Sequence, residues 1–145
     1  MGQPAAYWDS SALIPLCITQ PQSANAVQMY RSFAILTWWA SQVEIISGLT
    51  RLLRMGQLSN NEFVNGKQLA SSLIRKWNAA GFSPSAAPAA CALLELHPLR
   101  AADALQLAVA LEVCDRQPHG FSFITADRRL ADAAGKTGFA VEYLT

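Results

Sequence analysis

Four acidic residues lie far apart in the sequence and are the side chains best suited to act together. They are Asp9, Glu44, Asp103 and Asp127. Carboxylates brought together without a cation would repel one another and raise their own pKa values. A hard divalent ion such as Mg²⁺ removes that conflict, because it prefers oxygen ligands and keeps water or phosphate oxygens in its remaining positions. One or two such ions can activate water and neutralise charge on a phosphodiester, so these residues predict metal-assisted phosphodiester hydrolysis.

Each acid also has a simpler structural interpretation. Asp9 and Asp127 each follow an apolar run and precede a helical pattern, so either side chain could cap a helix. Asp103 falls in the first turn of a helix, where the helix dipole stabilises a carboxylate by roughly 0.3–1 kcal/mol. Glu44 could be an exposed glutamate on the solvent side of its helix. These interpretations need no metal and no chemistry.

Two of the acids are harder to explain in that way. Asp103 lies in an almost wholly apolar run, where a carboxylate should be paired, protonated or metal-bound because an isolated buried charge is costly. Within residues 101–109, Gln106 is the only other polar residue. Glu44 shares its helix with a stripe of small residues that would let the helix pack closely on the sheet and direct Glu44 inward. Asp103 is therefore the acid that is hardest to explain without a metal.

Short apolar runs that alternate with helical patterns must position these acids. Strands are predicted at 5–8, 35–37, 81–82, 121–125 and 139–143. Helices are predicted at 12–17, 24–33, 38–54, 59–77, 89–96, 99–113 and 127–134. This alternation favours an α/β protein, a three-layer α/β/α sandwich around a central parallel sheet, with residues 1–145 as a single domain. Ligands of such sheets bind beyond the carboxyl ends of the strands, where Asp9 and Asp127 are expected.

Composition restricts the class of protein. The chain has 145 residues, of which 52% are hydrophobic and 14% charged, so it can bury a core without disulfides. Its net charge of +1 excludes a strongly basic surface, and any nucleic-acid contact must use local patches. No apolar stretch reaches the ~18 residues of a membrane span. Without a signal-peptide pattern, and with three scattered cysteines expected to be buried thiols, the sequence predicts a cytoplasmic protein.

Four segments together resemble the successive motifs of PIN domains. They are residues 7–13 (YWDSSAL), 43–44 (VE), 99–108 (LRAADALQLA) and 124–131 (ITADRRLA). The likeness is strongest to the VapC toxins of bacterial toxin–antitoxin pairs. It extends over essentially the whole chain, with the motifs in order and at typical spacing. A single aspartate after a strand would be weak support, whereas four motifs in register are strong support.

The resemblance implies an endoribonuclease that depends on Mg²⁺ or Mn²⁺, cleaves RNA, forms a homodimer and is inhibited by a cognate antitoxin protein. Carried over motif by motif, its catalytic and metal-binding residues would be the four acids named above. Thr125 matches the small hydroxyl residue that often precedes the last aspartate. Gln106 is a departure, since many relatives carry His there. We expect that change to affect substrate contacts rather than the metal site.

Hydroxyl and basic residues beside the acids are candidates for supporting roles. Ser10, Ser11 and Thr125 could orient a carboxylate or the attacking water, although capping is the simpler role for them. Three arginines flank the predicted site and could hold RNA phosphates or acidic groups of an antitoxin, or could be solvated charges at helix ends. They are Arg100, Arg128 and Arg129, with Arg51 and Arg54 as weaker candidates.

Trp38 and Trp39 are predicted to begin the helix that carries Glu44. Two adjacent tryptophans cannot both face one core, so one of them is expected at a dimer or antitoxin surface, where aromatic residues are enriched. Base stacking on RNA is a less favoured role for it.

Two other functions stay open at this point. The first is a catalytically silent PIN-like module that only binds a protein partner or RNA. The presence of all four acids argues against it, because a silent module gains nothing from buried like charges. The second is a phosphotransfer or hydrolase domain that uses a strand-end aspartate as nucleophile. That chemistry commonly requires a second aspartate two positions on, where this chain has Ser11.

Overall fold

The computed structural model describes residues 2–145 and is built on a five-stranded sheet with the order β3-β2-β1-β4-β5. The strands are β1 (Ala5–Trp8), β2 (Ala34–Trp38), β3 (Asn78–Ala80), β4 (Ser122–Thr125) and β5 (Ala140–Tyr143). Each pair of neighbouring strands runs parallel. The chain builds outward from β1 to β3 on one side and then returns to add β4 and β5 on the other. The order of strands therefore reverses between β1 and β4, which is where ligands bind in open α/β sheets.

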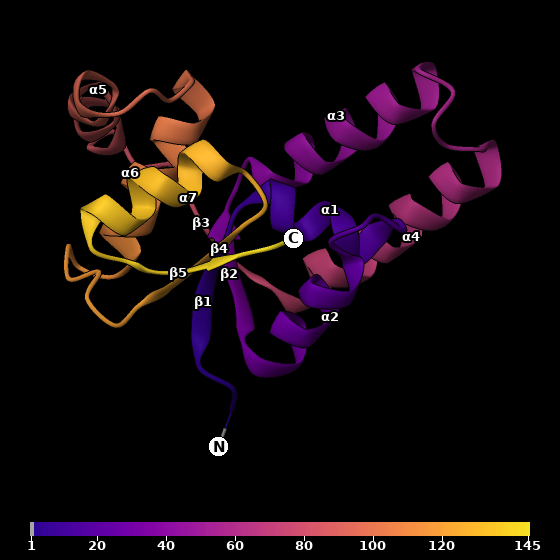
Figure 1. Cartoon of the computed structure of the whole chain (residues 1–145), viewed down its shortest axis with the longest axis horizontal. Helices are drawn as coiled ribbons and strands as arrows, with labels where there is room; N and C mark the ends of the chain where they lie inside the picture. The colour runs from indigo at the N-terminus through magenta and orange to yellow at the C-terminus, as the bar shows by residue number, and fades with distance from the viewer. Residues whose placement is uncertain (1) are drawn as a thin grey trace.

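Seven helices within residues 2–145 cover the two faces of this sheet (Figure 1). They are α1 (Ser10–Cys17), α2 (Ser23–Ser32), α3 (Ser41–Arg54), α4 (Asn60–Lys76), α5 (Ala86–Leu96), α6 (Ala101–Val113) and α7 (Arg128–Thr137). Helices α1 to α4 lie on one side and α5 to α7 on the other, and α3 and α4 together extend away from the sheet. The predicted three-layer α/β/α sandwich around a parallel sheet is confirmed.

Two apolar cores hold the layers together, one on each face of the sheet. Side chains alternate along a strand, so Ala6 and Trp8 enter the core under α1 to α4 while Tyr7 enters the core under α5 to α7. Tyr7 stacks on Phe123 of β4, with ring centroids 5.3 Å apart. The central strand is thus buried on both faces, as expected for parallel sheets. This burial fixes the position of Asp9, the residue that follows β1.

Helix boundaries agree with the sequence signals where local hydrogen bonds set them. The Ser59 hydroxyl accepts from the Glu62 amide at 3.1 Å, and the Glu62 carboxylate accepts from the Ser59 amide at 2.9 Å. This capping box starts α4 at the place that the sequence predicts. Gly138 ends α7 with φ 117, a left-handed conformation that favours glycine.

Three predictions about individual elements were wrong. The third strand is Asn78–Ala80 and not 81–82, because pairing with β2 at the sheet edge defines it, and Phe82 is 77% exposed. Trp38 ends β2, whereas the sequence analysis placed it at the start of the following helix. Cys91 is exposed on the outer surface of α5, so only Cys17 is a buried thiol.

No helix in the described part of the chain has both the length and the apolar character needed to cross a bilayer.

Candidate active site

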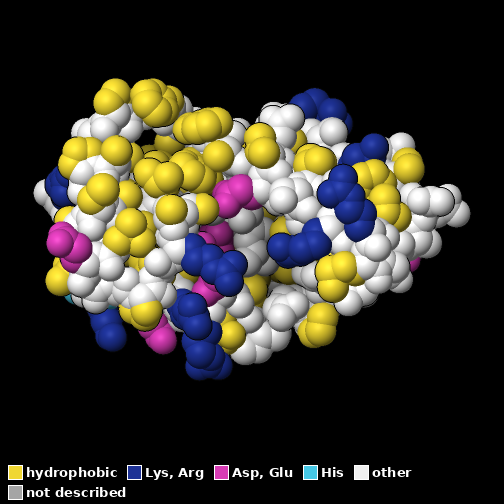
Figure 2. All heavy atoms as spheres, turned by 90° about the horizontal axis from the view of Figure 1, so that it is seen from above, with side chains coloured by type: hydrophobic (Ala, Val, Ile, Leu, Met, Phe, Trp, Pro, Cys, Tyr) yellow, Lys and Arg dark blue, Asp and Glu magenta, His cyan; other side chains and the backbone are white. Residues whose placement is uncertain are grey.

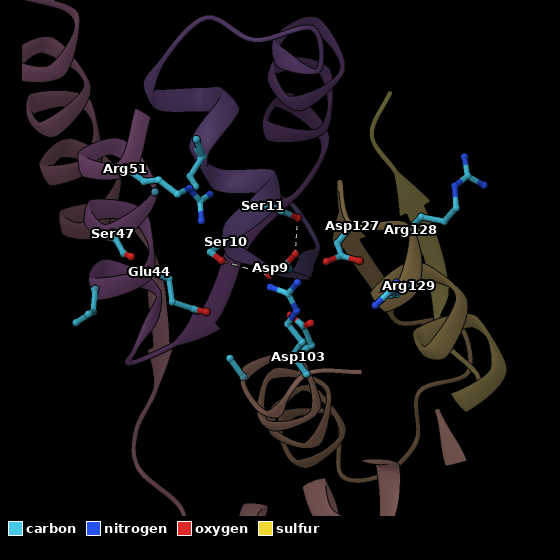
Figure 3. A pocket seen from close by; sticks show the side chains of 15 residues that line it. Asp9, Ser10, Ser11, Glu44, Ser47, Arg51, Asp103, Asp127, Arg128 and Arg129 are labelled. Carbon is cyan, nitrogen blue, oxygen red and sulfur yellow. Dashed lines mark hydrogen bonds between the residues drawn. The ribbon is translucent and has the colours of Figure 1, made fainter. Parts of the chain in front are cut away.

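The four acids lie together at the carboxyl edge of the sheet, although they come from four separate elements. Asp9 directly follows β1, and Asp127 comes two residues after β4, the parallel strand beside it. Glu44 and Asp103 lie in the first turns of α3 and α6. All four line one open cleft of about 700 Å³, and their side chains surround it in Figure 3. The structure therefore brings together every acid that the sequence analysis selected.

Asp9 is the most deeply buried of the four, with 3% of its surface exposed. Its Oδ2 accepts hydrogen bonds from Thr125 Oγ1 at 2.8 Å and from Ser11 Oγ, and its Oδ1 accepts one from Gln106 Nε2 at 2.9 Å. Burial raises the pKa of Asp9, the two hydroxyl bonds oppose that rise, and the nearby charge of Asp127 adds to it. The alternative interpretation of Asp9 as a helix cap does not hold, since its side chain makes no cap bond to α1.

The hydroxyl residues around Asp9 form a connected set. Ser10 Oγ lies 3.4 Å from Asp9 Oδ1, and Ser11 Oγ lies 3.2 Å from Thr125 Oγ1. The Ala126 amide donates to Ser11 Oγ at 2.9 Å, so this hydroxyl ties the start of α1 to the segment after β4. The hydroxyls hold the Asp9 carboxylate in place with neutral donors.

Glu44 points from α3 into the cleft, as the sequence analysis expected (Figure 3). Its Oε1 accepts from Trp38 Nε1 and from Gln106 Nε2, both at 2.9 Å. Burial is the main reason that the pKa of Glu44 is raised to about 7. The hydrogen bond from Trp38 lowers this pKa, and the charges of Asp9 and Asp103 raise it. Among the small residues of α3, Gly48 lies against Ile14 of α1, whereas Ser41 is buried with its hydroxyl 2.6 Å from Thr37 Oγ1 of β2.

Asp103 is only half-buried, so the expectation that it is the acid hardest to explain without a metal has to be corrected. The alanines before it in the first turn of α6 are exposed, and the apolar run around Asp103 becomes core only from Ala104 onward. Burial still raises the pKa of Asp103 to about 6, with the charges of Asp127 and Asp9 adding to the rise and Arg100 opposing it. Asp9 carries the stronger argument, because its burial is nearly complete.

Asp127 has two roles in the structure. Its Oδ1 accepts from the Leu130 amide at 3.1 Å, so it caps α7 as the sequence predicts. Its own amide donates to Thr125 Oγ1 at 3.0 Å. The same side chain lines the cleft with the other acids. Capping and participation in the site are therefore compatible at this position.

Gln106 belongs to this site, a role that the sequence analysis did not predict. It was expected to affect substrate contacts, but it is 1% exposed and bonded to two of the acids, Asp9 and Glu44. The signal was present in the sequence, since Gln106 is a single amide within an apolar helix. What the sequence could not show is that its partners come from β1 and α3.

Arginines lie on both sides of the acidic cleft. Arg51 comes from α3, Arg100 immediately precedes α6, and Arg128 and Arg129 begin α7. Figure 2 shows acidic side chains in a central hollow with basic side chains to either side. Arg128 points away from the acids in Figure 3, and its guanidinium carbon lies 5.1 Å from the centre of the Tyr143 ring. The expectation that Arg128 flanks the acids thus holds for its backbone position and not for its charge.

The donor set suits a hard divalent ion that is held loosely. Among residues 2–145, no three Asp, Glu, His or Cys side chains are grouped closely enough to hold an ion between them. Mg²⁺ commonly takes only one or two carboxylates and completes its shell with water and substrate oxygens, so an open arrangement fits it better than a closed cage would. The hydrogen-bond partners of Asp9 are neutral, which leaves its charge available to a cation.

The family model of the PIN domain matches residues 6–136. The chain belongs to the PIN domain family. The match spans all four acids of the cleft and every element from β1 to most of α7. A comparison of this PIN domain with curated proteins finds no match.

Two solved structures share the fold of this PIN domain. One is a toxin–antitoxin complex from Klebsiella pneumoniae, with a TM-score of 0.57 and 19% identity over 88% of this chain and 91% of that one. The other is FitAcB from Neisseria gonorrhoeae, with a TM-score of 0.64 and 17% identity over 94% of this chain and 95% of that one. At such identities the likeness shows the fold alone.

Proposed function

We propose that this PIN domain is a metal-dependent endoribonuclease and the toxin of a toxin–antitoxin pair. The observation that carries the proposal is the gathering of four carboxylates from four elements in one cleft, with arginines on both sides. Neither burial nor capping explains that gathering. A module that only binds a partner would gain nothing from it, because burial and mutual repulsion raise the pKa values of three of these acids.

The acids Asp9, Glu44, Asp103 and Asp127 would hold Mg²⁺ or Mn²⁺. When bound, such an ion lowers the pKa of water and neutralises charge that develops on the phosphodiester. The chain's own contribution is to orient the ligands, since Thr125 and Ser11 fix the Asp9 carboxylate and Trp38 fixes Glu44. Ligands held in place by such bonds lose less freedom on binding the ion.

RNA would lie along the cleft, between the arginines. Arg51 on one side and Arg100 and Arg129 on the other would contact phosphates, which fixes the position of the strand without reading its sequence. With a net charge of +1, RNA binding would have to rely on such a local patch. The expected binding is therefore weak, salt-dependent and concentrated at the cleft.

The antitoxin and the dimer are also part of the proposal. One of the two structures that share the fold is described as a toxin–antitoxin complex, which supports a protein partner for this chain. Trp39, two residues before α3, is 53% exposed, and Val43 in the first turn of α3 is 64% exposed, so this part of the chain offers apolar surface beside the cleft to an antitoxin or a second copy.

The deciding experiment is RNA cleavage by the purified protein with Mg²⁺ or Mn²⁺, compared with EDTA. Asp9→Asn should abolish cleavage, whereas Asp132→Asn, an exposed aspartate on α7 outside the cleft, should leave it unchanged. Cleavage that persists in EDTA, or in the Asp9 variant, would overturn the mechanism. Growth arrest on expression that the neighbouring gene's product relieves would test the toxin assignment separately.

A further inference from the structure

Gln106 is a fully buried amide in the middle of an apolar helix. It is 1% exposed, and its neighbours along α6 belong to the core under α5 to α7. A buried amide costs free energy unless its hydrogen-bonding groups find partners. The partners of this side chain therefore explain why an amide is tolerated there.

Each hydrogen-bonding group of the Gln106 amide has a defined partner. Its Nε2 donates to Asp9 Oδ1 and to Glu44 Oε1, both at 2.9 Å, which uses both N–H groups. Its Oε1 accepts from the Tyr7 hydroxyl at 3.0 Å. The orientation of the amide follows from these bonds, since a flipped amide would present its oxygen to two carboxylates.

Tyr7 holds the amide in that orientation. It is completely buried, stacked on Phe123 and located on the central strand, so its hydroxyl has a fixed position. The Tyr7 hydroxyl donates its hydrogen bond to the amide oxygen of Gln106, so only the NH₂ group faces the acids. The sheet thereby determines which end of the Gln106 side chain meets the carboxylates.

The two carboxylates that share Gln106 belong to different elements. Asp9 follows β1 and Glu44 lies on α3, a helix that extends away from the sheet. Hydrogen bonds to a charged acceptor are roughly twice as strong as those between neutral groups, so one amide that bonds both acids fixes their spacing. His, with one donor per nitrogen on a rigid ring, could not place two protons on one atom in this way.

We propose that Gln106 is a positioning residue, which sets the spacing of Asp9 and Glu44 for binding a divalent ion and is itself oriented by Tyr7. This inference rests on the proposed function, because it assigns a role within the same metal site. A purely structural amide would satisfy Tyr7 and fill the core without affecting metal affinity. The two roles differ in what happens to metal binding when the amide is replaced.

The test measures Mn²⁺ binding by titration calorimetry in wild-type protein and in Gln106→Met, which keeps the length of the side chain and removes its donors. The dissociation constant for Mn²⁺ should rise about 10–100-fold, as is usual when a residue that orients metal ligands is lost. The kcat for RNA cleavage should fall while KM for RNA stays unchanged. Gln68→Met, at an exposed position on α4, is the matched control and should alter none of these values.

If Gln106→Met does not fold, Tyr7→Phe provides the test of the positioning role. It removes only the hydroxyl that orients the amide, so its Mn²⁺ dissociation constant should rise above the wild-type value. If Gln106→Met folds and its Mn²⁺ affinity is unchanged, the positioning role is overturned. If that variant is unfolded, an unchanged Mn²⁺ affinity in Tyr7→Phe overturns it. Either result leaves the proposed function intact. Wild-type protein that binds no Mn²⁺ overturns the proposed function, and the inference with it.

Discussion

The indole Nε1 of Trp38 donates a hydrogen bond to Glu44 Oε1 at 2.9 Å. Trp38 is the last residue of β2, and Glu44 lies in the first turn of the helix that follows. The bond therefore links the rigid sheet to a helix that projects from it. Trp39, the next residue, is 53% exposed and is directed elsewhere. Of the two adjacent tryptophans, Trp38 therefore binds an acid of the cleft, whereas Trp39 is largely exposed.

Replacing Trp38 with Phe should reduce RNA cleavage by about 10–100-fold, because Glu44 loses a donor that orients it. The ring still fills the buried position, so the protein should fold. Trp39→Phe is the matched control and should cleave RNA at the wild-type rate. Single-turnover kinetics of both variants would check this, and equal rates for the two would show that the bond to Glu44 has no part in the reaction.

The four acids lie in one cleft, as the sequence predicted, and for two of them the position follows from general rules. Asp9 and Asp127 come after apolar runs that parallel sheets bury, and such residues meet at the carboxyl edge. The apolar runs also define the layers, since helices on both faces bury the central strands. Local signals, such as the capping box at Ser59, fixed the start of α4.

The relative burial of the acids could not be predicted in the same way. The apolar neighbours of Asp103 indicated deep burial, but a first turn can face solvent whatever the composition of the rest of the helix. Asp9 is deeper because β1 has partners on both sides, which depends on the order of strands in the sheet. The role of Gln106 likewise depends on contacts with residues more than thirty positions away in the sequence. The role of Trp38 depends on the exact end of β2. Hydrophobic periodicity reveals neither.

Asp127 allows its capping role to be separated from its role in the cleft. Asn caps helices as well as Asp does, so Asp127→Asn should retain the bond from the Leu130 amide and leave the melting temperature unchanged. Asp127→Ala should lose about 1 kcal/mol of stability along with the cap. Both variants should lose RNA cleavage, because both remove the charge. Thermal unfolding and cleavage assays would check this, and retained activity in Asp127→Asn would mean that Asp127 serves only as a cap.

The metal-free protein should become less stable as the pH rises from about 4 to about 7. The pKa of Glu44 is raised from 4.5 to about 7 and that of Asp103 from 3.8 to about 6. The folded state therefore holds more protons than the unfolded state in this window, and the free energy of unfolding falls as those protons are lost. Above the raised pKa values the loss is complete and the curve should level off.

Urea unfolding at a series of pH values in EDTA would measure this dependence. Comparison with Asp103→Asn isolates the contribution of one acid, since the other titrating groups are common to both proteins. The variant should show a smaller fall in stability over the same window, and added Mn²⁺ should reduce the fall in wild type by compensating the negative charges. The raised pKa of Asp103 would be contradicted by one outcome. That outcome is a stability that rises more between pH 4 and pH 7 in the wild type than in Asp103→Asn.

The arginines beside the cleft should differ in their contribution to RNA binding. Arg129 lines the cleft, whereas the guanidinium of its neighbour Arg128 lies over the Tyr143 ring and points away from the acids. Each phosphate contact that is lost should lower the slope of log affinity against log salt by about 0.7 for a single strand. Arg129→Ala, Arg51→Ala and Arg100→Ala should each show this change, and Arg128→Ala should show less.

Fluorescence anisotropy with single-stranded RNA over a range of KCl concentrations would measure these slopes. The Asp9→Asn background keeps the RNA intact during the titration. Arg75→Ala, on α4 and outside the cleft, serves as the control and should leave the slope unchanged. Because Arg128 and Arg129 are adjacent and carry the same charge, long-range attraction alone would affect them equally. A difference between them would therefore locate the RNA phosphates on the side of α7 that faces the acids, and equal slopes would refute that path.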